Sequence, residues 1–163
     1  MKNSVKKEIE KIIKKLKLNC SIEEFSNKVN WDYISRDQKL SEKFIREFSN
    51  KVDWYYISIE QKLSEDFILE FKDKIHWDYI SGCQKLSEDF IREFNDKVDW
   101  NCISKFQKLS EDFILEFKNK VNWGLLEEYQ NILKKDIEEY KSKKIIEENN
   151  KTRVKNKFQL IRF

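Results

Sequence analysis

The amino-acid sequence predicts an all-α protein, an α-solenoid of tandem 23-residue two-helix repeats with degenerate capping helices. Three observations support this prediction. All five tryptophans of the 163-residue chain stand 23 residues apart, and a fixed period of this length is typical of stacked helical units. Apolar side chains recur at the helical period of 3.6 residues. The repeats show no alternation of apolar and polar residues, and the chain holds two glycines and no proline, so hairpin signals are absent. The tryptophans are Trp31, Trp54, Trp77, Trp100 and Trp123.

Each repeat contains the start signals of two helices. Asn, Asp or His precedes each tryptophan, and Asn and Asp are strong N-caps because their oxygens accept from amides of the first turn. The Leu-Ser-Glu motif places a capping serine and acidic residues at a second start. In the second repeat these signals predict helices over residues 54–62 and 65–74. Helices this short need stacking for stability. The full repeats are residues 31–53, 54–76, 77–99 and 100–122.

The chain ends resemble modified repeats. Ser21 to Glu24 form a capping-box pattern, which predicts a second-type helix before Trp31. Ser4 is the expected cap of a helix with an apolar face before it. After Trp123, apolar residues continue in the repeat positions without the Ser-Glu break. The prediction is therefore one helical domain over residues 1–150, with an N-terminal capping region (4–30), a C-terminal capping region (123–150) and a basic, apolar tail (151–163).

Two invariant side chains call for a structural role. A large aromatic in a fixed position predicts a core between repeats, so we expect the tryptophans there. The glutamine of each repeat is equally constant, and two roles are open for it: an amide ladder between stacked units, or hydrogen bonds to the groups left free at helix ends.

Charge and composition restrict the class of protein. Residues 1–17 hold seven Lys and two Glu, residues 18–123 hold 16 basic and 21 acidic side chains, and the last thirteen residues hold five basic side chains and no acidic one. No signal-peptide pattern or membrane-length apolar run is present, which predicts an intracellular protein that is not secreted and does not enter a membrane. Three cysteines without CxxC spacing predict reduced thiols.

The sequence offers no catalytic set. His76 is the single histidine, and it occupies a capping position without a nucleophile pattern nearby. The repeated acidic pairs are interpreted as helix-start electrostatics, although paired carboxylates also occur in hydrolases. We therefore expect no enzymatic activity, no cofactor and no metal site.

Function is sought in the positions where the repeats differ, since constant positions define the scaffold. The hypothesis is a non-enzymatic protein-interaction or structural scaffold module with an unidentified protein partner, and the C-terminal tail is a candidate for self-association. Drift on a tolerant surface is the competing explanation for the variable positions. The candidate partner-binding residues are Tyr55, Ile59, Leu69, Phe106, Leu115, Arg36, Arg46, Arg92 and Lys105.

The alternative hypothesis is a nucleic-acid-associated protein that binds through its basic termini. A solvated surface is the competing explanation for these charges. At the N-terminus the candidates are the lysines of residues 6–15. In the C-terminal tail they are Lys151, Arg153, Lys155, Lys157 and Arg162.

The string W-D-Y-I-S-x-x-Q-K-L-S-E-x-F-I-x-E-F, as in residues 77–94, resembles the short Trp and Leu-Ser-Glu repeats of many uncharacterised proteins of giant DNA viruses. The resemblance spans roughly residues 18–145. The absence of alanine agrees with a very AT-rich genome. The resemblance implies a viral repeat protein, located in the host cytoplasm or a virion. It adds no mechanism, so no functional residue is carried over from it.

Overall fold

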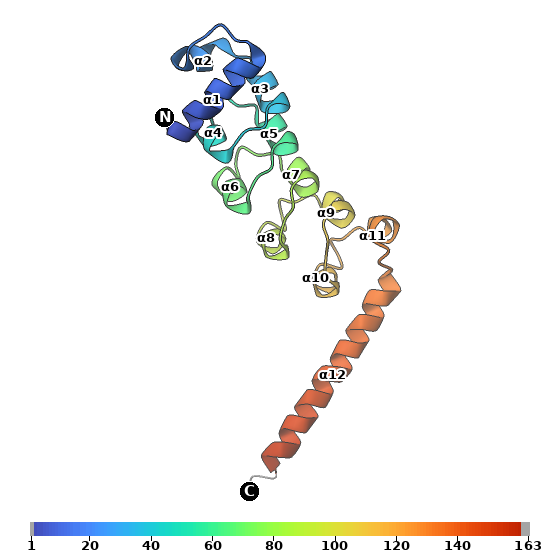
Figure 1. Ribbon diagram of the computed structural model, residues 1–163. Helices are drawn as coiled ribbons and strands as arrows, with labels where there is room; N and C mark the ends of the chain where they lie inside the picture. Colours follow the sequence, from blue (N-terminus) through green and yellow to red (C-terminus); the bar gives the residue numbers. More distant parts are fainter. Residues whose placement is uncertain (1, 161–163) are drawn as a thin grey trace. The chain divides into compact units, whose positions relative to one another are not determined.

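A computed structural model describes the backbone of residues 2–160 and the side chains of residues 2–146, 149 and 151. The described residues form twelve helices and no strand (Figure 1). The helices are α1 (Asn3–Leu16), α2 (Ile22–Lys28), α3 (Trp31–Asp37), α4 (Glu42–Glu47), α5 (Trp54–Glu60), α6 (Glu65–Glu70), α7 (Trp77–Cys83), α8 (Glu88–Glu93), α9 (Trp100–Phe106), α10 (Glu111–Glu116), α11 (Trp123–Gln130) and α12 (Lys134–Leu160).

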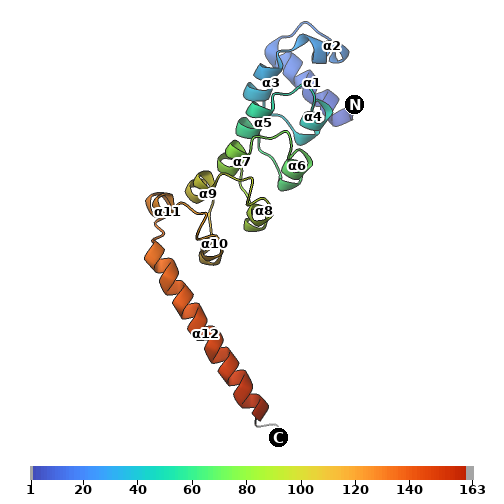
Figure 2. The ribbon, with the colours of Figure 1, turned by 180° about the vertical axis from the view of Figure 1, so that it is seen from behind.

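The chain forms two compact units, residues 1–98 and residues 99–163. In the first unit α3 packs against α5 and α5 against α7, so the Trp-initiated helices form one layer. Figures 1 and 2 show α4, α6 and α8 as a second row beside them. In the second unit α9 packs against α11, and α10 against α12. The prediction of an all-α solenoid of tandem two-helix repeats is thus confirmed.

Most of the helices begin directly after a residue that the sequence predicts as an N-cap. The Tyr33 N–H donates to Asn30 Oδ1 (2.9 Å) at the start of α3, and the Phe67 N–H donates to Ser64 Oγ (3.3 Å) at the start of α6. The capping box of Ser21 is complete before α2. These contacts satisfy amides that lack a partner within the helix. Local side-chain chemistry therefore defines where the helices start.

One expected cap is wrong. Ser4 lies inside the first turn of α1, because that helix begins at Asn3 and has Lys2 as its N-cap residue. His76 is the N-cap residue of α7, as its position predicts, but its side chain makes no capping hydrogen bond. The His76 ring packs edge-on against Tyr55, with centroids 5.8 Å apart.

The second helix of each repeat is shorter than the sequence predicts. In the second repeat α6 ends at Glu70, four residues before the expected end at Lys74. Phe71 leaves the helical conformation (φ −114°, ψ 26°). The amides of Lys74 and Ile75 then both donate to the Phe71 carbonyl (2.8 and 3.1 Å). This turn places Ile75 in the core, a tertiary contact that outweighs the helical pattern of the segment.

Phe and Ile side chains are the largest fully buried residues of the core, and the tryptophans lie at its edge. Ile57, Phe67 and Ile68 are fully buried, whereas Trp54 is half-buried. The Trp54 Nε1 donates to the Ser49 carbonyl (3.0 Å), and its ring lies 4.8 Å from that of Phe71 in the same repeat. The expectation that the tryptophans fill the core between repeats is therefore wrong, because the indole N–H must keep a polar partner.

The invariant glutamines connect one repeat to the next. Gln61 Oε1 accepts from the Leu40 N–H (2.9 Å), and its Nε2 donates to the carbonyls of Ser35 (2.9 Å) and Gln38 (2.8 Å). Gln84 makes the same three contacts one repeat later. Of the two roles left open, hydrogen bonding to helix-end backbone groups is confirmed for these glutamines. Backbone groups buried between repeats are thus satisfied by side chains.

Helix α1 provides the contacts that a preceding repeat would make. Within the array, Glu42 of α4 accepts from the Ser64 N–H (2.7 Å). Ser41 is the capping serine of the first repeat. Its N–H (2.8 Å) and its hydroxyl (2.6 Å) both donate to the carboxylate of Glu8 in α1. Lys15 Nζ donates to Gln38 Oε1 (2.8 Å). In the next repeat the corresponding glutamine oxygen accepts from a backbone amide instead, that of Leu40. The N-terminal region is therefore a cap with a sequence of its own.

The second unit ends in a long helix. After α11, Asn131 adopts the left-handed conformation (φ 57°) and turns the chain into α12. Ile137 is buried, and Tyr140 and Lys144 both bond to Asp112 of α10. Helix α12 continues through Leu160, so the boundary predicted between the C-terminal capping region and the tail lies within one helix. Residues 161–163 lie outside the described residues.

Candidate partner-binding surfaces

The candidate partner-binding residues are distributed over both helix layers. Five belong to Trp-initiated helices and four to the second helices. Tyr55, Leu69 and Phe106 are exposed, with 40%, 43% and 57% of their surface accessible. Ile59 and Leu115 are half-buried. Six of the nine predicted residues belong to the first unit, and Lys105, Phe106 and Leu115 belong to the second.

The predicted arginines are engaged within the molecule. Arg46 Nε lies 2.6 Å from Glu70 Oε2 in the next repeat, and its guanidinium covers the Phe67 ring at 4.8 Å. Arg36 forms a 2.8 Å ion pair with Asp37, and this contact raises the pKa of Arg36. Arg92 lies 2.7 Å from Asp89. These contacts stabilise the repeats and reduce the charge available to a partner.

An aromatic cluster surrounds Tyr55 in the first unit. The Tyr55 ring lies edge-on to Tyr79 (5.0 Å), His76 (5.8 Å) and Tyr56 (5.2 Å). A hydrogen bond joins the hydroxyls of Tyr79 and Tyr55 (3.3 Å). The pKa of Tyr55 is raised, chiefly by its contact with the Tyr79 hydroxyl. The mutual contacts fix these rings, so Tyr55 is less free than an isolated surface tyrosine.

A pocket of about 400 Å³ in the second unit brings two predicted residues together. Phe106 and Lys105 line it, with Tyr129 and Ile132 from the C-terminal capping region. The Lys105 Nζ lies 5.0 Å from the Phe106 ring centre and 4.2 Å from that of Tyr129. Tyr129 is 49% exposed. The pocket thus presents two accessible aromatic rings that share one cation.

Tyr129 was missed as a candidate, although its position contains a signal. It stands 23 residues after Phe106, in the position that holds Asp37, Glu60 and Cys83 in earlier repeats. The same position is therefore acidic or small in the first unit and aromatic in the second. Extending the repeat comparison into the degenerate unit would have found the pair.

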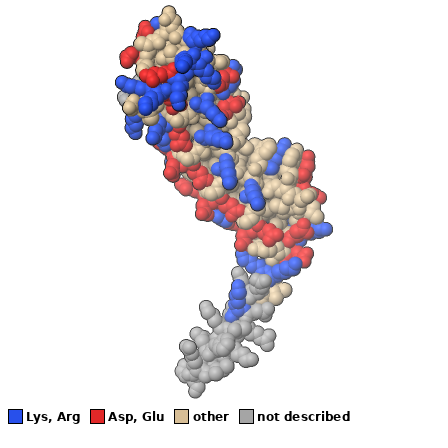
Figure 3. Space-filling model, viewed as in Figure 1, with Lys and Arg blue, Asp and Glu red and all other residues tan. Residues whose placement is uncertain are grey.

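The candidates for nucleic-acid contact are only partly within the described structure. Lys151 is exposed on α12. The side chains of Arg153, Lys155 and Lys157, and all of Arg162, lie outside the described residues. At the other end, the lysines of α1 at positions 6, 7, 11, 14 and 15 are exposed, and Figure 3 shows basic side chains gathered at that end of the first unit.

The described residues contain no group of three or more His, Cys, Asp or Glu that could hold a metal ion. Cys20, Cys83 and Cys102 are free thiols. Among the described helices, none combines the length and the apolar character that crossing a bilayer requires.

Comparison of the chain with protein-family models, with curated proteins and with solved structures gave no match. The resemblance to repeats of giant DNA viruses therefore stays a prediction. Evidence on function comes from the surfaces described above.

Proposed function

We propose that the protein is a non-enzymatic protein-interaction or scaffold module, and that a partner binds the aromatic pocket of the second unit. The observation that carries the proposal is the exposure of Phe106 and Tyr129, at 57% and 49%, beside a pocket that both rings line. Exposed aromatic side chains next to a pocket are the typical anchors of protein interfaces. Isolated exposed apolar residues need no such explanation, but these two are adjacent and share a cation.

The lysines of the pocket indicate the chemistry of the partner. Lys105 is held over both rings, and Lys108 also lines the pocket. A partner segment with an apolar side chain next to a carboxylate suits this arrangement, because the apolar group covers the rings while the carboxylate meets the ammonium groups. The repeats then serve as a rigid support for the pocket.

Two substitutions test the proposal with little risk to the fold. Phe106→Glu introduces the residue type that the second repeat already holds at this position as Glu60, and Tyr129→Glu changes the second ring. We expect the double variant to lose at least about thirtyfold in affinity for a partner captured by the unmodified protein, since anchor residues contribute about 2 kcal/mol or more.

Tyr33→Glu is the matched control, because Tyr33 is an exposed tyrosine (40%) on α3 of the first unit. Affinity would be measured with the purified partner by titration calorimetry, after circular dichroism shows equal helix content. Full binding by the double variant, or equal loss in the control, would contradict the proposed site.

The alternative function is association with nucleic acid through the basic termini. Its support is the exposed lysines of α1 and Lys151. It predicts oligonucleotide binding that weakens steeply with salt, because bound lysines displace counterions. Oligonucleotide binding that is lost on removal of residues 151–163 and unchanged in Phe106→Glu would favour the alternative over protein binding.

A further inference from the structure

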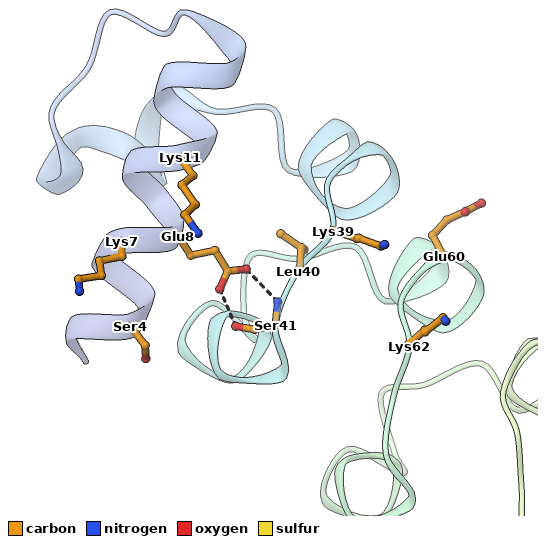
Figure 4. Close-up of a pocket in the computed structure, with 9 residues that line it drawn as sticks. All are labelled: Ser4, Lys7, Glu8, Lys11, Lys39, Leu40, Ser41, Glu60 and Lys62. Atoms are coloured by element: carbon orange, nitrogen blue, oxygen red, sulfur yellow. Dashed lines mark hydrogen bonds between the residues drawn. The ribbon is translucent and has the colours of Figure 1, made fainter.

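A second pocket lies in the first unit, where α1 meets the turns of the first two repeats. Its volume is about 660 Å³, which falls in the range of small-molecule sites. Lys7 and Lys11 line it from α1, and Lys39 and Lys62 from the turns that follow α3 and α5. Figure 4 shows the α1 residues on one side of Ser41 and the turn lysines on the other. Four lysines from three segments therefore line one pocket.

These lysines are available to a ligand. Lys7, Lys11, Lys39 and Lys62 are exposed, and within the described residues none of them forms an ion pair or a side-chain hydrogen bond. Glu8, which also lines the pocket, uses both carboxylate oxygens to accept from Ser41. That carboxylate thus has a structural partner and competes less for the lysines.

Charge in and around the pocket favours an anion. Its lining includes four lysines and two glutamates, Glu8 and Glu60. Ser4, in the first turn of α1, also lines it. No acidic residue lies in that first turn, so the positive end of the α1 dipole adds to the lysine charges. A contrasting pocket that includes residues of α6 and α8 is lined by Glu65, Asp66, Asp89 and Glu93. The positive pocket is therefore formed only where the lysines of α1 meet the repeat lysines Lys39 and Lys62.

We propose that the pocket formed by Lys7, Lys11, Lys39 and Lys62 binds a compact ligand that bears several phosphate groups. Ammonium groups act as separate point charges on flexible stems, which suits phosphates spread over a short ligand. The lining contains no aromatic ring and no arginine. A nucleobase therefore finds no stacking surface there, and a carboxylate finds no bidentate partner. This site is separate from the aromatic pocket and independent of protein binding.

Titration calorimetry of the full chain with inorganic tripolyphosphate tests the proposal. The unmodified protein is expected to bind one equivalent saturably. Lys7→Gln/Lys11→Gln should lower the affinity by about tenfold or more, since two charge contacts are lost. The matched control is Lys6→Gln/Lys14→Gln, which removes the same charge from exposed α1 positions that do not line this pocket.

A second pair of variants tests the opposite wall. Lys62→Gln should weaken tripolyphosphate binding, and Lys85→Gln, at the same repeat position but outside this pocket, should not. Absence of saturable binding, or equal losses in a variant and its control, would overturn the proposal. Tighter binding of a hexaglutamate peptide than of tripolyphosphate would also overturn it, by assigning the pocket to acidic peptides.

Discussion

The N-terminal cap and the repeats make the same contacts with different residues. In the repeats, Glu42 and Glu65 of the second helices accept from the next capping serine. In the cap, Glu8 of the longer helix α1 does so. The array therefore requires a carboxylate at that point in space and does not require the repeat sequence around it. The rest of the cap has its own sequence, and α1 carries several exposed lysines.

Deletions should separate the cap from the repeats most clearly. Removing residues 54–76 joins Asp53 to Trp77 and brings equivalent positions together, so a shorter cooperative fold is expected. Removing residues 2–20 should unfold or aggregate the first unit, because it exposes the core around Val5 and Ile9 and leaves Ser41 and Gln38 without their α1 partners. Thermal melts by circular dichroism would check both. Equal melting temperatures for the two deletion variants would show that the array folds without α1 as a cap.

Replacing a repeat glutamine should lower the free energy of unfolding more inside the array, at Gln61, than beside the N-terminal cap, at Gln38. Gln61→Ala removes three hydrogen bonds to buried backbone groups, and we expect the free energy of unfolding to fall by about 3 kcal/mol. Gln38→Ala releases the Lys15 ammonium, which can reach water, and should cost about 1 kcal/mol. Urea denaturation would measure both values. A larger decrease in the free energy of unfolding for Gln38→Ala than for Gln61→Ala would contradict this prediction.

The carboxylates that hold the capping serines should have similar effects in both regions. Glu8→Gln and Glu42→Gln each weaken a hydrogen bond to a serine amide (2.8 and 2.7 Å). A decrease of about 1 kcal/mol in the free energy of unfolding is expected for each. A clear decrease in the free energy of unfolding for Glu42→Gln, with no decrease for Glu8→Gln, would refute the equivalence of the two contacts. Urea denaturation is again the measurement, with Glu10→Gln on α1 as a control.

The smallest expected effect concerns pH at the C-terminal cap. Lys144 and Tyr140 hold the pKa of Asp112 below its ordinary value by hydrogen bonding to its carboxylate. A carboxyl with a lowered pKa in the folded state stabilises the fold above its unfolded pKa, and this contribution disappears as pH falls through the folded pKa. The protection factors of the amides in the first turns of α12, obtained by hydrogen exchange after correction for the intrinsic exchange rate, should therefore fall in acid. Asp112→Asn should remove this fall. An unchanged acid response in that variant would assign the effect to another group.

The sequence by itself determined the period, the fold class and most helix starts. These depend on local interactions: a Ser64 hydroxyl caps the amide of Phe67, three residues away, and apolar spacing identifies the buried face. The same local rules misplaced the end of α6, because the turn at Phe71 puts Ile75 in the core. They also misplaced the start of α1, which precedes Ser4.

Only the tertiary structure decided which residues meet across repeats. Gln61 reaches the Gln38 carbonyl, 23 positions earlier, and Glu8 reaches Ser41, 33 positions later. The sequence left two roles open for the glutamines and gave no indication of the α1 contacts. It likewise did not pair Phe106 with Tyr129 or place Lys7 and Lys62 around one cavity. Such contacts depend on how helices stack, and repeat spacing alone does not specify which side chains face each other across a stack.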